Sequence, residues 1–113
     1  LSAIIQALND RFGTDFSEED RLFFEQIKEK ASKDERIIQT AMANPLDKFE
    51  LGIKAIIASL MMQRMAENDG IVTRYMDDSS FQQAIFPILA KEIYKSILER
   101  QERIPFGATR EQA

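Results

Sequence analysis

The residues from Glu67 to Asp78 read ENDGIVTRYMDD and include several side chains that could do chemistry. The adjacent carboxylates of Asp77 and Asp78 could bind Mg²⁺, but such a site needs further oxygen ligands in fixed geometry. Two serines follow, and this pattern favours oxygens that cap the free N–H groups of a helix start. We therefore predict a cap. Arg74 remains a candidate contact, because an Arg among apolar neighbours often pairs with a carboxylate or faces a partner.

The composition excludes the common enzyme classes. The chain has no His and no Cys, so imidazole bases, Cys-His or Ser-His-Asp sites and zinc sites with nitrogen or sulfur ligands are ruled out. Its four glycines stand apart, and no phosphate-binding loop occurs. It has no Glu-x-Lys of the kind that metal-dependent nucleases use. We expect no catalytic, cofactor-binding or metal-binding residue in this chain.

The charge is unevenly distributed along the chain. A net charge of −4 argues against a nucleic-acid binder that uses its whole surface. Residues 1–50 carry 7 basic and 11 acidic side chains, whereas residues 51–113 carry 8 of each. Any basic surface therefore belongs to the second half of the chain.

The basic side chains of the second half are its most informative polar feature. Lys91 and Lys95 are four residues apart on one predicted helix, and Lys54 lies on the helix before it. If the two helices are neighbours, the cations could form a stripe that faces phosphates and supplies affinity without sequence specificity. The alternative is a solvated helix face. Five residues are the candidate contacts with DNA or a partner: Arg64, Arg74, Lys91, Lys95 and Arg100.

Helical periodicity and capping signals divide the first half into three helices. Apolar residues at helical spacing predict a helix over residues 1–12, ended by Gly13 in the left-handed conformation. Ser17 predicts the start of a second helix, with Phe16 as an apolar staple. The capping box that begins at Ser32 predicts the start of a third helix, which closes before Pro45.

Two longer helices are expected in the second half. The fourth helix begins at Pro45 and reads as the longest and most apolar, the centre of the bundle, with Asn68–Gly70 as its stop. Residues 71–76 would then form a connection packed on the bundle. The last helix spans Ser80–Gln101, and Pro87 either kinks it or starts its main part. Three methionines of the fourth helix could form an adaptable groove or belong to the core: Met61, Met62 and Met65.

These elements predict an all-α fold, an irregular bundle of about five to six helices. We expect one domain over residues 1–103 and an irregular tail over residues 104–113. No apolar run reaches the ~20 residues that a membrane span needs. The chain has no initiator Met and no signal-peptide pattern, so we expect a piece of a longer cytoplasmic protein.

Two strings carry a resemblance to a known family. They are FGTDFSEEDRLFFEQIKEKASKDERIIQTAMANPLDKFELGIK and ENDGIVTRYMDDSSFQQAIFPILAKEIY. With the helix that connects them, they resemble the C-terminal region of the motor (R, HsdR) subunit of type I restriction enzymes of the IC family. The resemblance covers nearly all of the chain up to about Tyr94 and fades in the tail.

The resemblance implies a function but no catalytic residue here. Such a subunit has a nuclease domain and two helicase-like motor domains upstream of a helical region, so the ATP and Mg²⁺ that the parent would use bind elsewhere. The helical domain would help the motor to join the methyltransferase and specificity subunits, and would contact the double-stranded DNA of the full complex, with no role at a membrane. Two alternatives remain: a free-standing helical protein–protein adaptor without a nucleic-acid role, and a small-ligand domain that uses the Met-rich helix.

Overall fold

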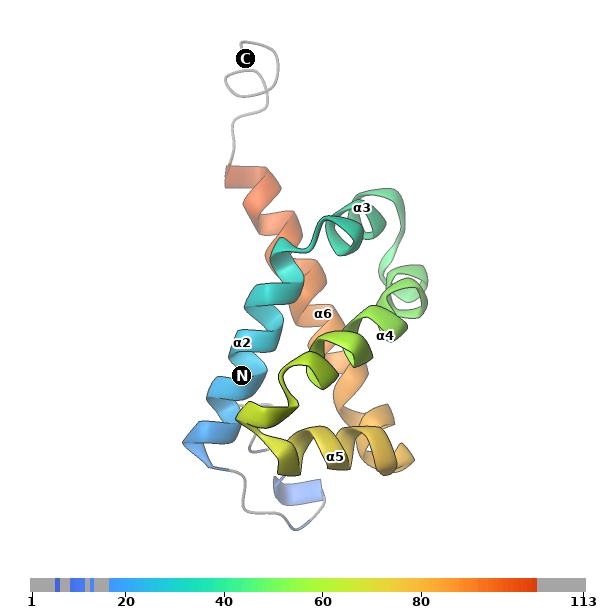
Figure 1. The fold of residues 1–113 in the computed structure, drawn as a ribbon. Helices are drawn as coiled ribbons and strands as arrows, with labels where there is room; N and C mark the ends of the chain where they lie inside the picture. Colours follow the sequence, from blue (N-terminus) through green and yellow to red (C-terminus); the bar gives the residue numbers. More distant parts are fainter. Residues whose placement is uncertain (1–5, 7–8, 12, 14–16, 104–113) are drawn as a thin grey trace.

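The computed structural model describes residues 6, 9–11, 13 and 17–103, and the regular structure in this part of the chain is helical. Its elements follow in the order α2 (Glu18–Lys33), α3 (Glu35–Ala43), α4 (Leu46–Gln63), the 3₁₀ turn η1 (Met65–Glu67), α5 (Asp69–Asp77) and α6 (Ser79–Arg103). Figure 1 labels α2 to α6. The predicted all-α bundle of five to six helices is confirmed.

Some predictions fall on residues that are not described. The Phe16 staple, most of the first predicted helix and the tail over 104–113 lie outside the described residues. The division between a domain at 1–103 and a tail therefore stays a prediction. Gly13 is described, and its φ of 60° is the predicted left-handed conformation.

The longest helix of the bundle is α6. This helix has 25 residues, against 18 in α4, and it packs against α2, α3, α4 and α5 (Figure 1). Of the described α-helices, α4 is the most apolar, as predicted, and it too packs against four others, but the prediction that it is the longest is wrong. The physical reason is that α6 continues through Pro87, whose fixed φ suits a helix even though its missing N–H leaves one helical bond unmade. The carbonyl of Gln83, four residues back, has no α-helical donor.

The hydrophobic core collects one apolar face from each helix. It consists of Phe23, Phe24, Ile27, Ala31, Ile37, Ala41, Phe49, Ile53, Ile57, Leu60, Met61, Ile71, Val72, Tyr75, Phe81, Ile85, Phe86, Leu89, Ala90, Ile93 and Ile97. One polar anchor accompanies this packing: the Tyr94 hydroxyl of α6 donates to the Asn44 carbonyl at 2.9 Å, while its ring lies 4.9 Å from that of Phe49. This contact fixes α6 against the junction of α3 and α4.

The helix starts follow the sequence signals with local corrections. At α2, Ser17 and Asp20 form a capping box, in which the Asp20 carboxylate accepts from the Ser17 N–H at 2.8 Å. At α3, the cap is Asp34, which accepts from the Arg36 N–H at 2.9 Å, and the prediction of Ser32 is wrong. The buried Ser32 hydroxyl donates to the Lys28 carbonyl instead, which keeps Ser32 inside α2.

The fourth helix begins one residue later than expected, because Pro45 occupies the cap position and Leu46 is the first helical residue. Among the described residues, no helix combines the length and the apolar character that crossing a bilayer requires.

Candidate interaction surfaces

The segment ENDGIVTRYMDD forms a helix of its own. α4 already ends at Gln63, and Asn68 begins α5, with its side-chain oxygen accepting from the Ile71 N–H at 3.2 Å. The prediction that residues 68–70 stop the fourth helix and 71–76 form a connection is therefore wrong. Ile71 and Val72 are buried, and tertiary packing of this kind outweighs the weak helix propensity of β-branched residues.

The two aspartates at the end of this segment have separate surroundings. The Asp78 carboxylate accepts from the Phe81 N–H at 3.1 Å and caps α6, as predicted. Asp77 is exposed on α5. Within the described part of the chain, no group of three or more carboxylates lies together in a way that could hold a metal ion.

Arg74 is engaged at the corner between α5 and α6. Its guanidinium lies 5.2 Å from the centre of the Phe81 ring, in cation–π range, and its Nε lies 3.7 Å from the Asp78 carboxylate. The side chain is about one-third exposed, so its outer edge faces solvent. Arg74 thus has a structural role beside the α6 cap, and its contact with DNA or a partner stays a prediction.

Arg64 and Arg100 both reach α2, the first from the end of α4 and the second from α6. Arg64 follows α4 and donates to the Gln26 side chain at 3.1 Å and to Glu67 at 2.9 Å. Arg100 of α6 donates to the Ser32 carbonyl at 3.2 Å and lies 3.5 Å from the Glu29 carboxylate. Each arginine therefore joins two elements of the bundle, which is a sufficient physical role for its charge.

Lys91 and Lys95 are the two candidate cations that stay exposed on α6 without an ion-pair partner among the described residues. Lys95 lines a shallow hollow between α6 and α2 that also holds Lys28 and the carboxylates of Glu92 and Glu99. The surface between α6 and α2 therefore carries both positive and negative side chains. Of the five predicted contacts, Lys95 and Arg100 border α2 from α6, and Lys91 precedes Lys95 by one turn. Arg64 reaches α2 from the end of α4, and Arg74 lies between α5 and α6.

An apolar stripe on the solvent side of α4 is the most unusual surface. Leu51, Ala55, Ala58 and Met62 follow one another at i, i+4, i+7 and i+11, which places them on one face of the helix. Leu51 is 79% exposed and Met62 is 48% exposed. We call these four residues the outer α4 stripe. Because α4 also buries its opposite face in the core, it is apolar on both sides, as a helix at an interface is.

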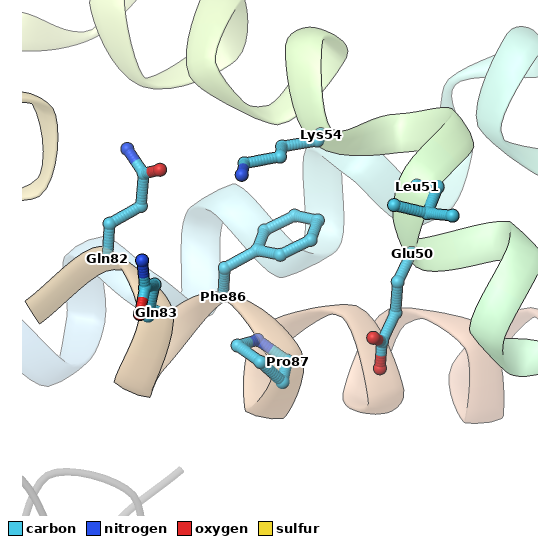
Figure 2. A pocket seen from close by; sticks show the side chains of 7 residues that line it. All are labelled: Glu50, Leu51, Lys54, Gln82, Gln83, Phe86 and Pro87. Atoms are coloured by element: carbon cyan, nitrogen blue, oxygen red, sulfur yellow. The ribbon is translucent and has the colours of Figure 1, made fainter. Parts of the chain in front are cut away.

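The stripe continues into a groove between α4 and α6, which Figure 2 shows from close by. This α4–α6 groove is lined by Glu50, Leu51, Lys54, Gln82, Gln83, Phe86 and Pro87 and encloses about 180 Å³. Leu51 and Pro87 are the exposed apolar edges, and the largely buried Phe86 ring lies between the two helices. The volume is similar to the ~150 Å³ of apolar cavities that accept a benzene ring.

The charged side chains of the groove stand apart from each other. In Figure 2, the Lys54 amine extends toward Gln82, and the Glu50 carboxylate extends past Pro87 on the other side of the Phe86 ring. Among the described residues, neither makes an ion pair. The groove therefore presents a cation, an apolar centre and an anion to the solvent.

The sequence reasoning missed the outer α4 stripe and the groove. It assigned one apolar face to the fourth helix, although the second periodic set from Leu51 to Met62 was a readable signal. Of the three methionines, Met61 belongs to the core and Met65 packs against it, as the core alternative predicts, whereas Met62 is exposed on the stripe. Comparisons of the chain with protein-family models, with curated proteins and with solved structures gave no match.

Proposed function

We propose that this chain is an accessory helical domain of the R subunit of a type I restriction enzyme, and that it docks the motor onto the methyltransferase core. It performs no chemistry itself. ATP-dependent translocation and DNA cleavage belong to the upstream domains of the parent that the resemblance implies. The partners are the methyltransferase and specificity subunits, with double-stranded DNA reached through the full complex.

The observation that carries this proposal is the outer α4 stripe. A Leu that is 79% exposed adds no burial to the core of a free-standing bundle, and the contiguous apolar stripe around it is a surface suited to binding another protein. The core side of α4 is complete without these residues, since Phe49, Ile53 and Ile57 are fully buried there. The second apolar face is therefore free to serve association.

The second part of the proposal is contact with the DNA backbone, and Lys91 and Lys95 are the residues that we propose for it. Both amines are exposed and have no ion-pair partner in the described part of the chain, so they can approach phosphates without breaking an internal contact. Two lysines supply modest, salt-dependent affinity and no sequence recognition. The choice of DNA site then rests with the specificity subunit.

The direct test uses the 113-residue chain itself. The purified chain is added in excess to a mixture of the full R subunit and the methyltransferase–specificity core on DNA, and formation of the complete complex is followed by gel shift. As a docking domain, the chain occupies the site on the core and inhibits assembly in proportion to its concentration. A chain that does not affect assembly at any concentration, while remaining folded by circular dichroism, would contradict the proposal.

A further inference from the structure

We infer that the α4–α6 groove is the docking site for one short segment of the methyltransferase–specificity core. This segment carries an acidic residue, an apolar anchor and a basic residue, in that order along the groove. This inference rests on the proposed docking function. It goes further by identifying which part of the surface binds and which chemistry it recognises.

The apolar centre of the groove defines the anchor. Leu51 and Pro87 form opposite edges, on α4 and α6, and the Phe86 ring lies between them (Figure 2). An opening of about 180 Å³ suits one aliphatic or aromatic side chain. Interface energy concentrates in anchors of this kind, which fill a pocket and exclude water from its edge.

The two charged residues define the direction of the bound segment. A carboxylate of the partner complements the Lys54 amine on the Gln82 side of the groove. An Arg or Lys complements the Glu50 carboxylate on the other side. Since both charges lack an ion-pair partner among the described residues, docking breaks no internal pair. A segment bound in reverse would place like charges together, which disfavours the wrong orientation.

The backbone of α6 adds an acceptor to the groove. Pro87 has no N–H, so the carbonyl of Gln83 lacks the donor that an ordinary helix would supply. Gln83 and Pro87 both line the groove, together with Glu50. The Gln83 carbonyl offers one hydrogen-bond acceptor to an N–H or O–H donor of the bound segment at the α6 edge of the groove.

The test measures the affinity of the full R subunit for the purified methyltransferase–specificity core. Leu51→Glu introduces a charge at the exposed edge and should weaken binding about tenfold or more. Its matched control is Met42→Glu, which makes the same kind of change at a side chain that is 51% exposed on α3 and should leave binding unchanged. Circular dichroism and thermal unfolding confirm that both variants keep the fold.

Exchange of the Glu50 and Lys54 charges tests whether binding depends on the order of the charges or only on the net charge. Lys54→Glu should weaken binding about threefold to tenfold, whereas Lys48→Glu on the same helix should not. The double variant Glu50→Lys with Lys54→Glu has the wild-type net charge but the reverse order of charges, and it should bind at least as weakly as Lys54→Glu alone. Wild-type affinity in this double variant would overturn the oriented recognition.

The outcomes separate this inference from the docking proposal. One outcome is that removal of the whole chain from the R subunit abolishes binding while the Leu51→Glu and Lys54→Glu variants bind as wild type does. In that case the domain docks through another surface, and the groove is not the docking site. If removal of the chain changes nothing, the docking proposal itself fails. If Leu51→Glu dissolves a homodimer of the R subunit and leaves core binding intact, the occupant is a second copy, and the inference is overturned.

Discussion

The side chains of Asp20 and Asn68 join two helix starts that are far apart in the sequence. The Asn68 side-chain N–H donates to the Asp20 carboxylate at 2.7 Å. The other oxygen of Asp20 accepts from the Ser17 N–H at the start of α2, and the Asn68 oxygen accepts from the Ile71 N–H at the start of α5. The two caps thus form one network that holds α5 against α2.

Two replacements of Asn68 should distinguish the stability that comes from the α5 cap from the stability that comes from the hydrogen bond to Asp20. Asn68→Ser keeps a capping oxygen but cannot reach Asp20, and it should lower the free energy of unfolding by about 1 kcal/mol. Asn68→Ala also loses the cap and should cost about 2 kcal/mol. Urea denaturation followed by circular dichroism measures both. In a double-mutant cycle, Asp20→Ala and Asn68→Ala should show a coupling of about 1 kcal/mol, and strict additivity would contradict the link.

The two tyrosines should respond oppositely to removal of the hydroxyl group. The Tyr75 hydroxyl is buried without a hydrogen-bond partner among the described residues, whereas the Tyr94 hydroxyl donates to the Asn44 carbonyl. Tyr75→Phe should therefore leave stability unchanged or raise it by about 1 kcal/mol, and Tyr94→Phe should lower it by about 1 kcal/mol. Thermal and urea unfolding compare the two. A clear loss in Tyr75→Phe would show that its hydroxyl does have a partner.

Tyr75 should also limit stability at alkaline pH. Burial raises the pKa of the Tyr75 phenol above its ordinary value of 10.0, so the folded state holds this proton more tightly than the unfolded state does. Below pH 10 the phenol is protonated in both states, and its ionisation does not affect the free energy of unfolding. As the pH rises above 10.0, the unfolded state loses this proton first, and the free energy of unfolding falls. Unfolding measured from about pH 8 to 11 should therefore show a shallower alkaline decline in Tyr75→Phe than in Tyr94→Phe.

Asp34 should produce part of the acid sensitivity. The hydrogen bond from the Arg36 guanidinium at 2.9 Å lowers the pKa of the Asp34 carboxyl below its ordinary value of 3.8. Because the folded-state pKa is the lower one, this stabilisation is present above pH 3.8 and is lost as the pH falls through the folded value. Asp34→Asn keeps a cap without the charge, so stability should fall less steeply below about pH 5. An equally steep loss of stability below about pH 5 in Asp34→Asn and in the wild type would contradict a stabilising Asp34–Arg36 ion pair.

Under the proposed function, Lys91 and Lys95 should control the salt dependence of DNA binding by the full complex. If each contacts a phosphate, Lys91→Gln with Lys95→Gln should reduce the slope of log K against log salt by about 1 to 2. Lys30→Gln with Lys33→Gln, which removes the same charge from the last turn of α2, is the matched control and should leave the slope unchanged. Equal slopes in both variants would exclude direct contact by the α6 lysines.

The sequence allowed the helices of this fold to be predicted where periodicity and capping agree. The starts of α2 and α6 were predicted from Ser17 and Asp78, and the break after α2 was predicted within two residues. The prediction failed at α5, because Asn-Asp-Gly is compatible with both a helix stop and a helix cap. Only the burial of Ile71 and Val72 decides between the two, and burial depends on tertiary packing.

The candidate site was harder to predict, because charge in a sequence does not show which charges are already paired. Arg64 and Arg100 reach α2 through contacts that span 38 and 68 residues of sequence. No local pattern encodes such distances. The groove has the same origin, since Leu51 and Pro87 meet only once α4 packs against α6.

The most direct measurement of the proposed docking role compares the full R subunit to which we assign this chain with a version that lacks it. Equilibrium binding of each to the methyltransferase–specificity core is titrated at three salt concentrations, with motor ATPase activity as the control for intact upstream domains. We predict that the shortened subunit keeps its ATPase activity but binds the core at least about tenfold more weakly at every salt concentration. Equal binding by both subunits would contradict the account.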